Sequence, residues 1–157
     1  MLPLNLNKST DVCWLNAAAI YYDDNEGLSD TFDEIFSVNV KSNEVLIEYA
    51  LTLNKKVNVV LISSSSSTRG RANLTNYSAA KAALNSIVES QAERLCERNV
   101  YLNAVIPEKV NTPLIAKLYK TEINLRELLE PKEVINAIMY LASSSEHGQL
   151  IHIRKGL

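Results

Sequence analysis

The chain has 157 residues, of which 46% are apolar and 22% are charged, and its net charge is −2 from 16 basic and 18 acidic side chains. This balance is typical of a globular protein, and we expect residues 1–157 to form a single domain. No basic cluster provides an electrostatic footprint for nucleic acid, and no apolar run is long enough to cross a bilayer. The opening segment MLPLNLNKSTD lacks a basic stretch followed by an apolar core, so the sequence predicts a cytoplasmic protein that binds neither nucleic acid nor membrane.

Short apolar runs alternate with helical patterns along the chain. Four runs predict buried strands: residues 12–20 (ending near Asn16), 57–62, 100–106 and 149–153. Three segments predict helices. They are residues 30–53, whose apolar residues recur at helical spacing, residues 77–97, and residues 130–144, which have proline in the first turn. The alternation predicts right-handed crossovers onto a parallel sheet with helices on both faces, which is an α/β fold.

Small and polar residues follow three of the predicted strands. Ligands of such sheets bind beyond the carboxyl ends of the strands, so these residues are candidates for a site. They are Asn16, Ala17 and Ala18 after the first strand, Ser63 and Ser64 after the second, and residues 107–113 (PEKVNTP) after the third.

Tyr77 and Lys81 lie four residues apart and share one face of a predicted helix. A free tyrosine has a pKa of roughly 10, and a nearby ammonium lowers that pKa, so the pair suits proton donation. A strand-end serine such as Ser64 could hydrogen-bond a substrate carbonyl while a nicotinamide delivers hydride. The alternative is that the pair lies on a solvated helix by chance and has no chemical role.

The segments LISSSSSTRGRANLTNYSAAKAAL and FDEIFSVNVKS resemble the serine-to-lysine segment and the asparagine-bearing helix of the short-chain dehydrogenase/reductase family. The resemblance implies a carbonyl substrate, NADP or NAD as cofactor, and a catalytic set of Asn39, Ser64, Tyr77 and Lys81. In that set Tyr77 would donate the proton and Lys81 would lower its pKa and hold the nicotinamide ribose. Ser64 would orient the carbonyl, and Asn39 would hold a water of the proton relay.

Two further segments match this family with departures. LNAAAI stands where the family has Asn-Ala-Gly, with Ala18 replacing the glycine, and LNAVIPEKVNTPL has Glu108 where the family has a glycine. The resemblance implies that the cofactor contacts Tyr77, Lys81 and the residues of these two segments, namely Asn16, Ala17, Ala18, Pro107, Glu108, Val110 and Thr112.

The segments TRGR (68–71) and PEKVNTP also resemble one branch, the reductase domain of bifunctional ribulose 5-phosphate reductase/CDP-ribitol pyrophosphorylase enzymes. This resemblance implies reduction of ribulose 5-phosphate to ribitol 5-phosphate. Arg69 and Arg71, with Ser64, then become candidates for substrate binding, because arginine suits bidentate phosphate contacts. Solvated loop charges are an equal alternative for the two arginines.

Glycine is scarce: the chain has only four glycines and no G-x-G-x-x-G turn. We therefore expect an incomplete Rossmann-like, doubly wound parallel sheet that lacks the N-terminal glycine-rich βαβ unit. A catalytically inactive, reductase-like interaction domain is the alternative to an enzyme. The family pairs subunits through helices that correspond to residues 30–53 and 77–97, which implies a homo-oligomer. The two histidines have no ligand cluster around them, so no metal site is expected.

Overall fold

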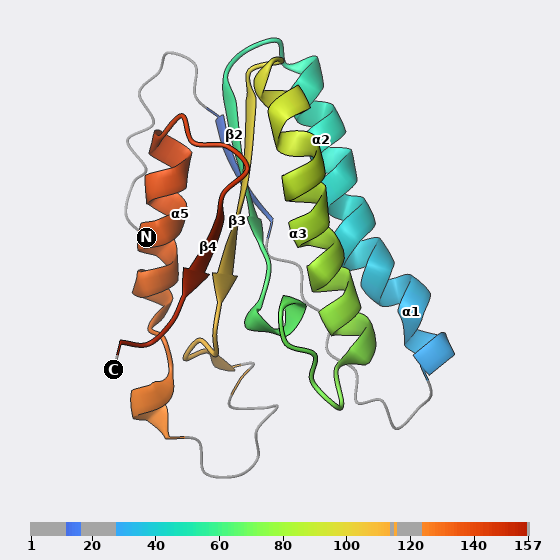
Figure 1. Cartoon of the computed structure of the whole chain (residues 1–157), viewed down its shortest axis with the longest axis vertical. Coiled ribbons are helices and arrows are strands. Elements are labelled where there is room, and N and C mark those ends of the chain that lie inside the picture. The colour runs from blue at the N-terminus through green and yellow to red at the C-terminus, as the bar shows by residue number, and fades with distance from the viewer. Residues whose placement is uncertain (1–11, 17–27, 114, 116–123, 157) are drawn as a thin grey trace.

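Four parallel strands form one sheet in the order β1-β2-β3-β4, as Figure 1 shows for the computed structural model. The structure describes residues 12–16, 28–113, 115 and 124–156. The strands are β1 (Val12–Asn16), β2 (Val57–Ile62), β3 (Val100–Pro107) and β4 (Leu150–Ile153). Each expected strand is present, within a few residues of its predicted bounds. The expected α/β fold with an incomplete Rossmann-like parallel sheet is therefore confirmed.

The helices are α1 (Leu28–Phe36), α2 (Ser42–Thr52), α3 (Thr75–Cys96) and α5 (Pro131–Ser143). Short helical turns lie at Ser37–Lys41 (η2), Ser65–Ser67 (η3) and Leu125–Glu127 (η4). The helix predicted over residues 30–53 is α1, η2 and α2 in succession, with η2 wound as a π-helix. A π-turn inside an α-helix is rare and occurs often at functional sites.

Two apolar clusters cover the opposite faces of the sheet. On one face α2 and α3 pack against side chains such as Val59 and Leu61, with Leu84 of α3 fully buried between them. On the other face α5 packs against Val60 and Val105. The clusters use alternating residues of β2 because successive side chains of a strand point to opposite faces. The central strands are thus buried on both sides, as their apolar sequences predict.

The crossover from β3 to β4 corrects the expectation of right-handed connections throughout. The sheet order follows the chain order, so every crossover steps in the same direction. Helices α1, α2 and α3 lie over one face in right-handed connections, whereas α5 lies over the opposite face (Figure 1). The connection through α5 is therefore left-handed, which is seen in only about 2% of such units.

The carboxyl ends of all the strands lie together at the lower end of the molecule in Figure 1, where η3 follows β2. The end of β2 lies beside β3 there: the backbone N–H of Ser63, the residue after β2, donates to the carbonyl oxygen of Val105 in β3 at 2.9 Å. This edge holds most of the side chains that the sequence marks as candidates. No helix among the described residues is long and apolar enough to span a membrane.

Candidate active site

The serine segment after β2 is fixed by its own hydrogen bonds. Ser64 has an extended backbone and caps η3: its Oγ accepts the backbone N–H of Ser66 at 3.2 Å. The neighbouring Ser63 is buried, and its Oγ donates to the carbonyl oxygen of Lys81 at 3.1 Å. Because the Ser64 hydroxyl oxygen serves as the acceptor in the cap, its hydrogen can be donated to a ligand.

Lys81 is a buried cation at the carboxyl end of β2. Its side chain is held where Nζ donates to the carbonyl oxygen of Ile62 at 2.8 Å, and the residue is only 2% exposed. Burial penalises the charged ammonium and lowers the pKa of Lys81 from 10.5 to about 8. The lysine therefore still carries its charge in most molecules at neutral pH.

Tyr77 lies one turn before Lys81 and is also buried, with 4% of its surface exposed. The Lys81 Nζ atom lies over its ring, 5.6 Å from the centroid. These positions rule out the alternative that the pair lies on a solvated helix face. Two titratable side chains inside the fold, beside a serine-rich strand end, form an arrangement suited to proton transfer.

Asn39 is fully buried in the middle of η2, which packs against α3. Its side-chain Nδ2 donates to the carbonyl oxygen of Ile35 at 3.0 Å, and its own carbonyl oxygen accepts from Nδ2 of Asn43 at 2.6 Å. Its Oδ1 atom is buried and has no hydrogen-bond partner among the described residues. Such a buried acceptor suits a water molecule, in line with the relay role that the resemblance implies.

The other candidates for cofactor contact lie at and after the carboxyl ends of β1 and β3. Pro107 is buried, Glu108 is exposed, and Val110 and Thr112 are half-buried. Val110 forms a parallel bridge with Leu129, which ties this segment to the start of α5. Asn16 ends β1 and pairs with Leu61, whereas Ala17 and Ala18 lie outside the described residues.

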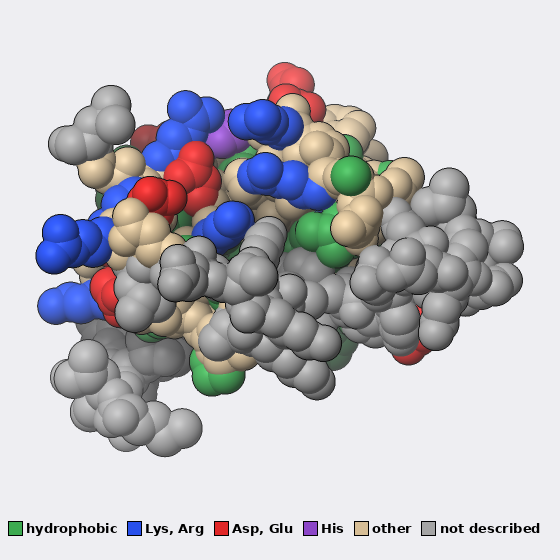
Figure 2. Space-filling view, turned by 90° about the horizontal axis from the view of Figure 1, so that it is seen from below, with side chains coloured by type: hydrophobic (Ala, Val, Ile, Leu, Met, Phe, Trp, Pro, Cys, Tyr) green, Lys and Arg blue, Asp and Glu red, His purple; other side chains and the backbone are tan. Residues whose placement is uncertain are grey.

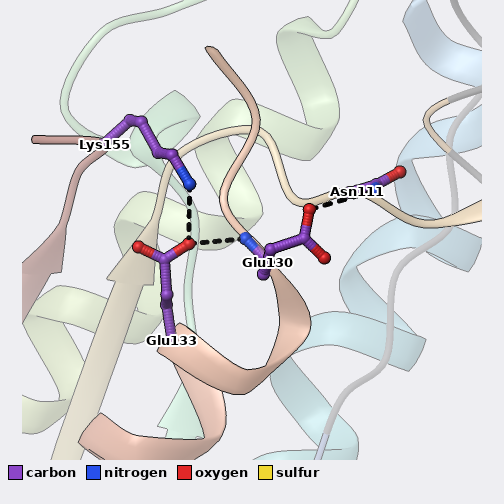
Figure 3. A network of polar contacts seen from close by, with 4 residues as sticks. All are labelled: Asn111, Glu130, Glu133 and Lys155. Carbon is purple, nitrogen blue, oxygen red and sulfur yellow. Dashed lines mark hydrogen bonds and ion pairs between the residues drawn. The ribbon is translucent and has the colours of Figure 1, made fainter. Parts of the chain in front are cut away.

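A polar network holds the loop after β3 against α5. The amide of Asn111 donates to Glu130 at 3.2 Å (Figure 3). A carboxylate oxygen of Glu133 accepts the backbone N–H of Glu130 at 2.7 Å and the ammonium of Lys155 at 3.1 Å. These polar groups are paired with one another, so we interpret the network as a structural support for the loop that follows β3.

Arg69 is exposed and Arg71 is half-buried, in the loop between η3 and α3. Neither forms an ion pair with another residue of the described part of the chain. Figure 2 looks onto this end of the molecule and shows Lys and Arg side chains with Asp and Glu side chains among them. The edge is therefore a surface of mixed charge, and within the described ranges no group of three or more metal-ligating side chains lies together.

The sequence reading did not single out three side chains that hold the site together: Asn43, Ser67 and Asn85. Asn85 lies one helical turn after Lys81 and so faces the same side of α3. This spacing from Lys81 is the sequence feature that could have identified Asn85. The contacts of Ser67 and Asn43 depend on the turn η3 and on the π-turn, which local sequence patterns do not reveal.

The fold and this site define a Rossmann-like protein with a buried tyrosine–lysine pair. A family model described as enoyl-(acyl carrier protein) reductase matches residues 8–157. The chain belongs to the short-chain dehydrogenase/reductase family.

Curated relatives and solved structures support this membership. The chain is 32% identical over 139 residues to a 3-oxoacyl-(acyl-carrier-protein) reductase of Aquifex aeolicus, covering 80% of this chain and 56% of that protein. It is 31% identical over 131 residues to the bifunctional ribulose 5-phosphate reductase/CDP-ribitol pyrophosphorylase of Haemophilus influenzae, covering 80% of this chain and 27% of that protein. A solved short-chain dehydrogenase/reductase family protein superimposes with a TM-score of 0.78 at 22% identity, covering 92% of this chain and 66% of that one. The chain thus spans little more than half the length of the first of these relatives.

Proposed function

We propose that the chain is the catalytic-residue-bearing part of a cytoplasmic, NAD(P)H-dependent carbonyl reductase. The observation that carries the proposal is the burial of Tyr77 and Lys81, with Lys81 bound to the last residue of β2 and Ser64 capping the turn that follows. Relatives described as reductases provide independent support.

The side chains have complementary roles in the proposed reaction. The Ser64 hydroxyl donates a hydrogen bond to the substrate carbonyl oxygen and orients it beside Tyr77. The Tyr77 hydroxyl gives its proton to that oxygen, and the ammonium of Lys81 stabilises the phenolate that is left. Asn39 holds a water through which the phenolate regains a proton.

A nicotinamide cofactor supplies the hydride for carbonyl reduction when it is bound. The residues fit the nicotinamide end of such a molecule, because a buried ammonium and the ends of β2 and β3 converge on one edge. Lys81 would hold the ribose, and Asn16, Pro107, Val110 and Thr112 would line the neighbouring surface. The 157 residues contain no G-x-G-x-x-G turn for the pyrophosphate. The residues of this chain therefore fit the nicotinamide half of the cofactor.

We further propose a phosphorylated ketose, ribulose 5-phosphate, as the substrate that is reduced to ribitol 5-phosphate. The Haemophilus influenzae relative carries that reductase activity in its name, and Arg69 and Arg71 are placed in the loop next to Ser64. The competing substrate is a 3-oxoacyl thioester, as in the name of the Aquifex aeolicus relative.

The first experiment is a titration of the purified chain with NADPH, followed by the fluorescence of the cofactor and of Trp14, the single tryptophan. Saturable binding in the micromolar range, followed by NADPH oxidation with ribulose 5-phosphate, supports the reductase. The Tyr77→Phe variant should bind NADPH and fail to oxidise it. Absence of binding up to millimolar NADPH would contradict the proposal.

The two arginines are tested with paired substrates. Arg69→Ala and Arg71→Ala should raise the KM for ribulose 5-phosphate and leave that for unphosphorylated ribulose unchanged. Arg98→Ala is the control, because Arg98 is exposed like Arg69 but follows α3 at the opposite end of the sheet. An equal effect on both sugars would show that the arginines do not bind the phosphate.

A second function is an interaction domain that pairs with another copy of itself without turnover. The observation that favours it is the exposure of large apolar side chains on α1 and α2, where Phe32, Val45 and Tyr49 are between 43% and 55% exposed. Val45 and Tyr49 are four residues apart and share one face of α2. Large exposed apolar groups on one helical surface are typical of protein interfaces. We propose that these exposed side chains of α1 and α2, together with the adjoining α3, form a homo-oligomer contact whether the chain is a reductase or an interaction domain.

A further inference from the structure

The carbonyl oxygen of Ser64 is the end of a short chain of side-chain hydrogen bonds that begins on α3. The amide Nδ2 of Asn85 donates to the hydroxyl oxygen of Ser67 at 2.9 Å. That hydroxyl in turn donates to the Ser64 carbonyl oxygen at 2.6 Å, beside the backbone N–H of Ser67 at 2.9 Å. Each hydrogen bond polarises the next, so the chain is stronger than its separate parts.

Two other contacts join the same segment to α3 on the other side of Ser64. Lys81 Nζ binds the carbonyl oxygen of Ile62, and Ser63 Oγ binds the carbonyl oxygen of Lys81. Asn85 follows Lys81 by one helical turn, so the three contacts lie along one side of α3. Ser64 is therefore held before and after by the helix that carries Tyr77 and Lys81.

Asn85 itself is suited to this task. It is only 8% exposed, so water competes little for its amide. Its Oδ1 is buried and accepts no hydrogen bond from the described residues. The orientation of the side chain therefore pairs its Nδ2 with Ser67 and leaves its own Oδ1 without a partner among those residues. Burial of an unsatisfied oxygen is costly, and a residue that keeps only a packing role has no need of it.

We propose that Asn85 is a positioning residue that acts through Ser67 to fix Ser64 relative to Tyr77 and Lys81. The inference rests on the proposed reductase function, because it assigns a partner to the serine of that reaction. It also implies that contacts with α3 help to set the arrangement of the serine, the tyrosine and the lysine. Small displacements of an orienting group have large effects on rate.

The test combines the Asn85→Leu variant with Ser64→Ala. In the chain with Ser64, Asn85→Leu should lower kcat by about tenfold while the KM for NADPH stays unchanged. In the Ser64→Ala background the same change should lower kcat less than about twofold, because there is no hydroxyl left to position. Equal losses in both backgrounds would overturn the proposal, since they would show that Asn85 acts elsewhere.

A second measurement separates failure of this inference from failure of the reductase proposal. Hydrogen exchange of the Ser66 and Ser67 amides reports the Ser64 geometry directly, because the first donates to Ser64 Oγ and the second to its carbonyl oxygen. Both amides should exchange at least about tenfold faster in Asn85→Leu and in Ser67→Ala. Ser86→Ala, an exposed neighbour on α3, should leave them unchanged.

Unchanged exchange in Asn85→Leu would overturn the positioning role, whatever the activity of the chain. Faster exchange in a chain that reduces nothing would support the contact and contradict the reductase proposal alone.

Discussion

The Nζ atom of Lys81 lies 2.8 Å from the carbonyl oxygen of Ile62, so the last residue of β2 holds the lysine of α3 in place. A backbone carbonyl stabilises the ammonium without neutralising its charge, unlike a carboxylate. The Nζ atom also lies over the ring of Tyr77, so the charge acts on the tyrosine as well. This contact gives the tyrosine–lysine pair a defined place at the edge of the sheet.

Replacing Tyr77 by phenylalanine removes the proposed proton donor and leaves the ring in the core. We expect the reduction rate to fall by at least about 10²-fold, because general acid catalysis contributes roughly 10² to 10⁴. The melting temperature should change little, since the ring remains buried. Tyr49→Phe is the control: Tyr49 is 51% exposed on α2, and its hydroxyl has no proposed role in the chemistry. Equal rates in Tyr77→Phe and Tyr49→Phe would exclude Tyr77 as the proton donor.

The buried Lys81 makes the stability of the fold depend on pH. Its pKa is lowered by burial from 10.5 to about 8, so the folded chain binds this proton less tightly than the unfolded chain does. The free energy of unfolding should therefore rise as the pH increases from about 8 to about 10.5, by about 3 kcal/mol from this group. Below pH 8 both states hold the proton, and the full cost of the buried charge is present.

Lys81→Met isolates this contribution, because methionine fills similar space without a charge. Urea unfolding of both proteins between pH 7 and pH 10.5 should show the variant to be the more stable at pH 7, with the gap closing above pH 8. Stability curves that run parallel over this range would contradict a lowered lysine pKa.

The fold followed from the sequence wherever a local pattern determines it. The apolar, β-branched segment before Ser63 predicted a central strand, and the spacing of Tyr77 and Lys81 placed both on one face of α3. Their burial could not be predicted, because the face of a helix that turns inward depends on the sheet beneath it. The hydrogen bond from Lys81 Nζ to the carbonyl oxygen of Ile62 depends on that packing.

Other features depend on contacts far apart in the chain. The left-handed connection through α5 requires knowing which face of the sheet is already covered by α2 and α3. The π-turn at Asn39 coincides with side chains that take up the carbonyl groups of the preceding turn, such as Asn43. The Asn85–Ser67 contact joins residues 18 apart, and no periodicity marks it.

The exposed apolar surface of α1 and α2 should hold two copies together. Val45→Glu places a charge among these exposed apolar side chains, and we expect it to convert a dimer into a monomer, because an unpaired charge is costly in an interface. Ile135→Glu on α5 is the matched control, since Ile135 is 53% exposed and Val45 is 55% exposed. Light scattering after size-exclusion chromatography gives the mass of each variant. A Val45→Glu protein that remains dimeric would locate the interface elsewhere.

Glu133 should make the start of α5 sensitive to acid. Its pKa is lowered first by the hydrogen bond from the backbone N–H of Glu130 and then by Lys155. The ordinary pKa of a glutamate carboxyl is 4.5. A carboxylate whose pKa is lowered in the folded state stabilises the fold at pH values above that ordinary pKa, and this stabilisation is lost as the pH falls through the folded pKa. The difference in unfolding free energy between the natural chain and Glu133→Gln should therefore shrink when the pH is lowered from 7 to 3.

The variant Lys155→Met separates the effects of the two partners of Glu133 on its pKa. It removes the ammonium at 3.1 Å and keeps the backbone hydrogen bond at 2.7 Å. Because the backbone contact is the first cause of the lowered pKa and is kept in this variant, part of the pH dependence that Glu133→Gln abolishes should survive in Lys155→Met. Urea unfolding of the three proteins at pH 7, 5 and 3 makes the comparison. A pH dependence that disappears in Lys155→Met would show that the ion pair, and not the helix start, governs Glu133.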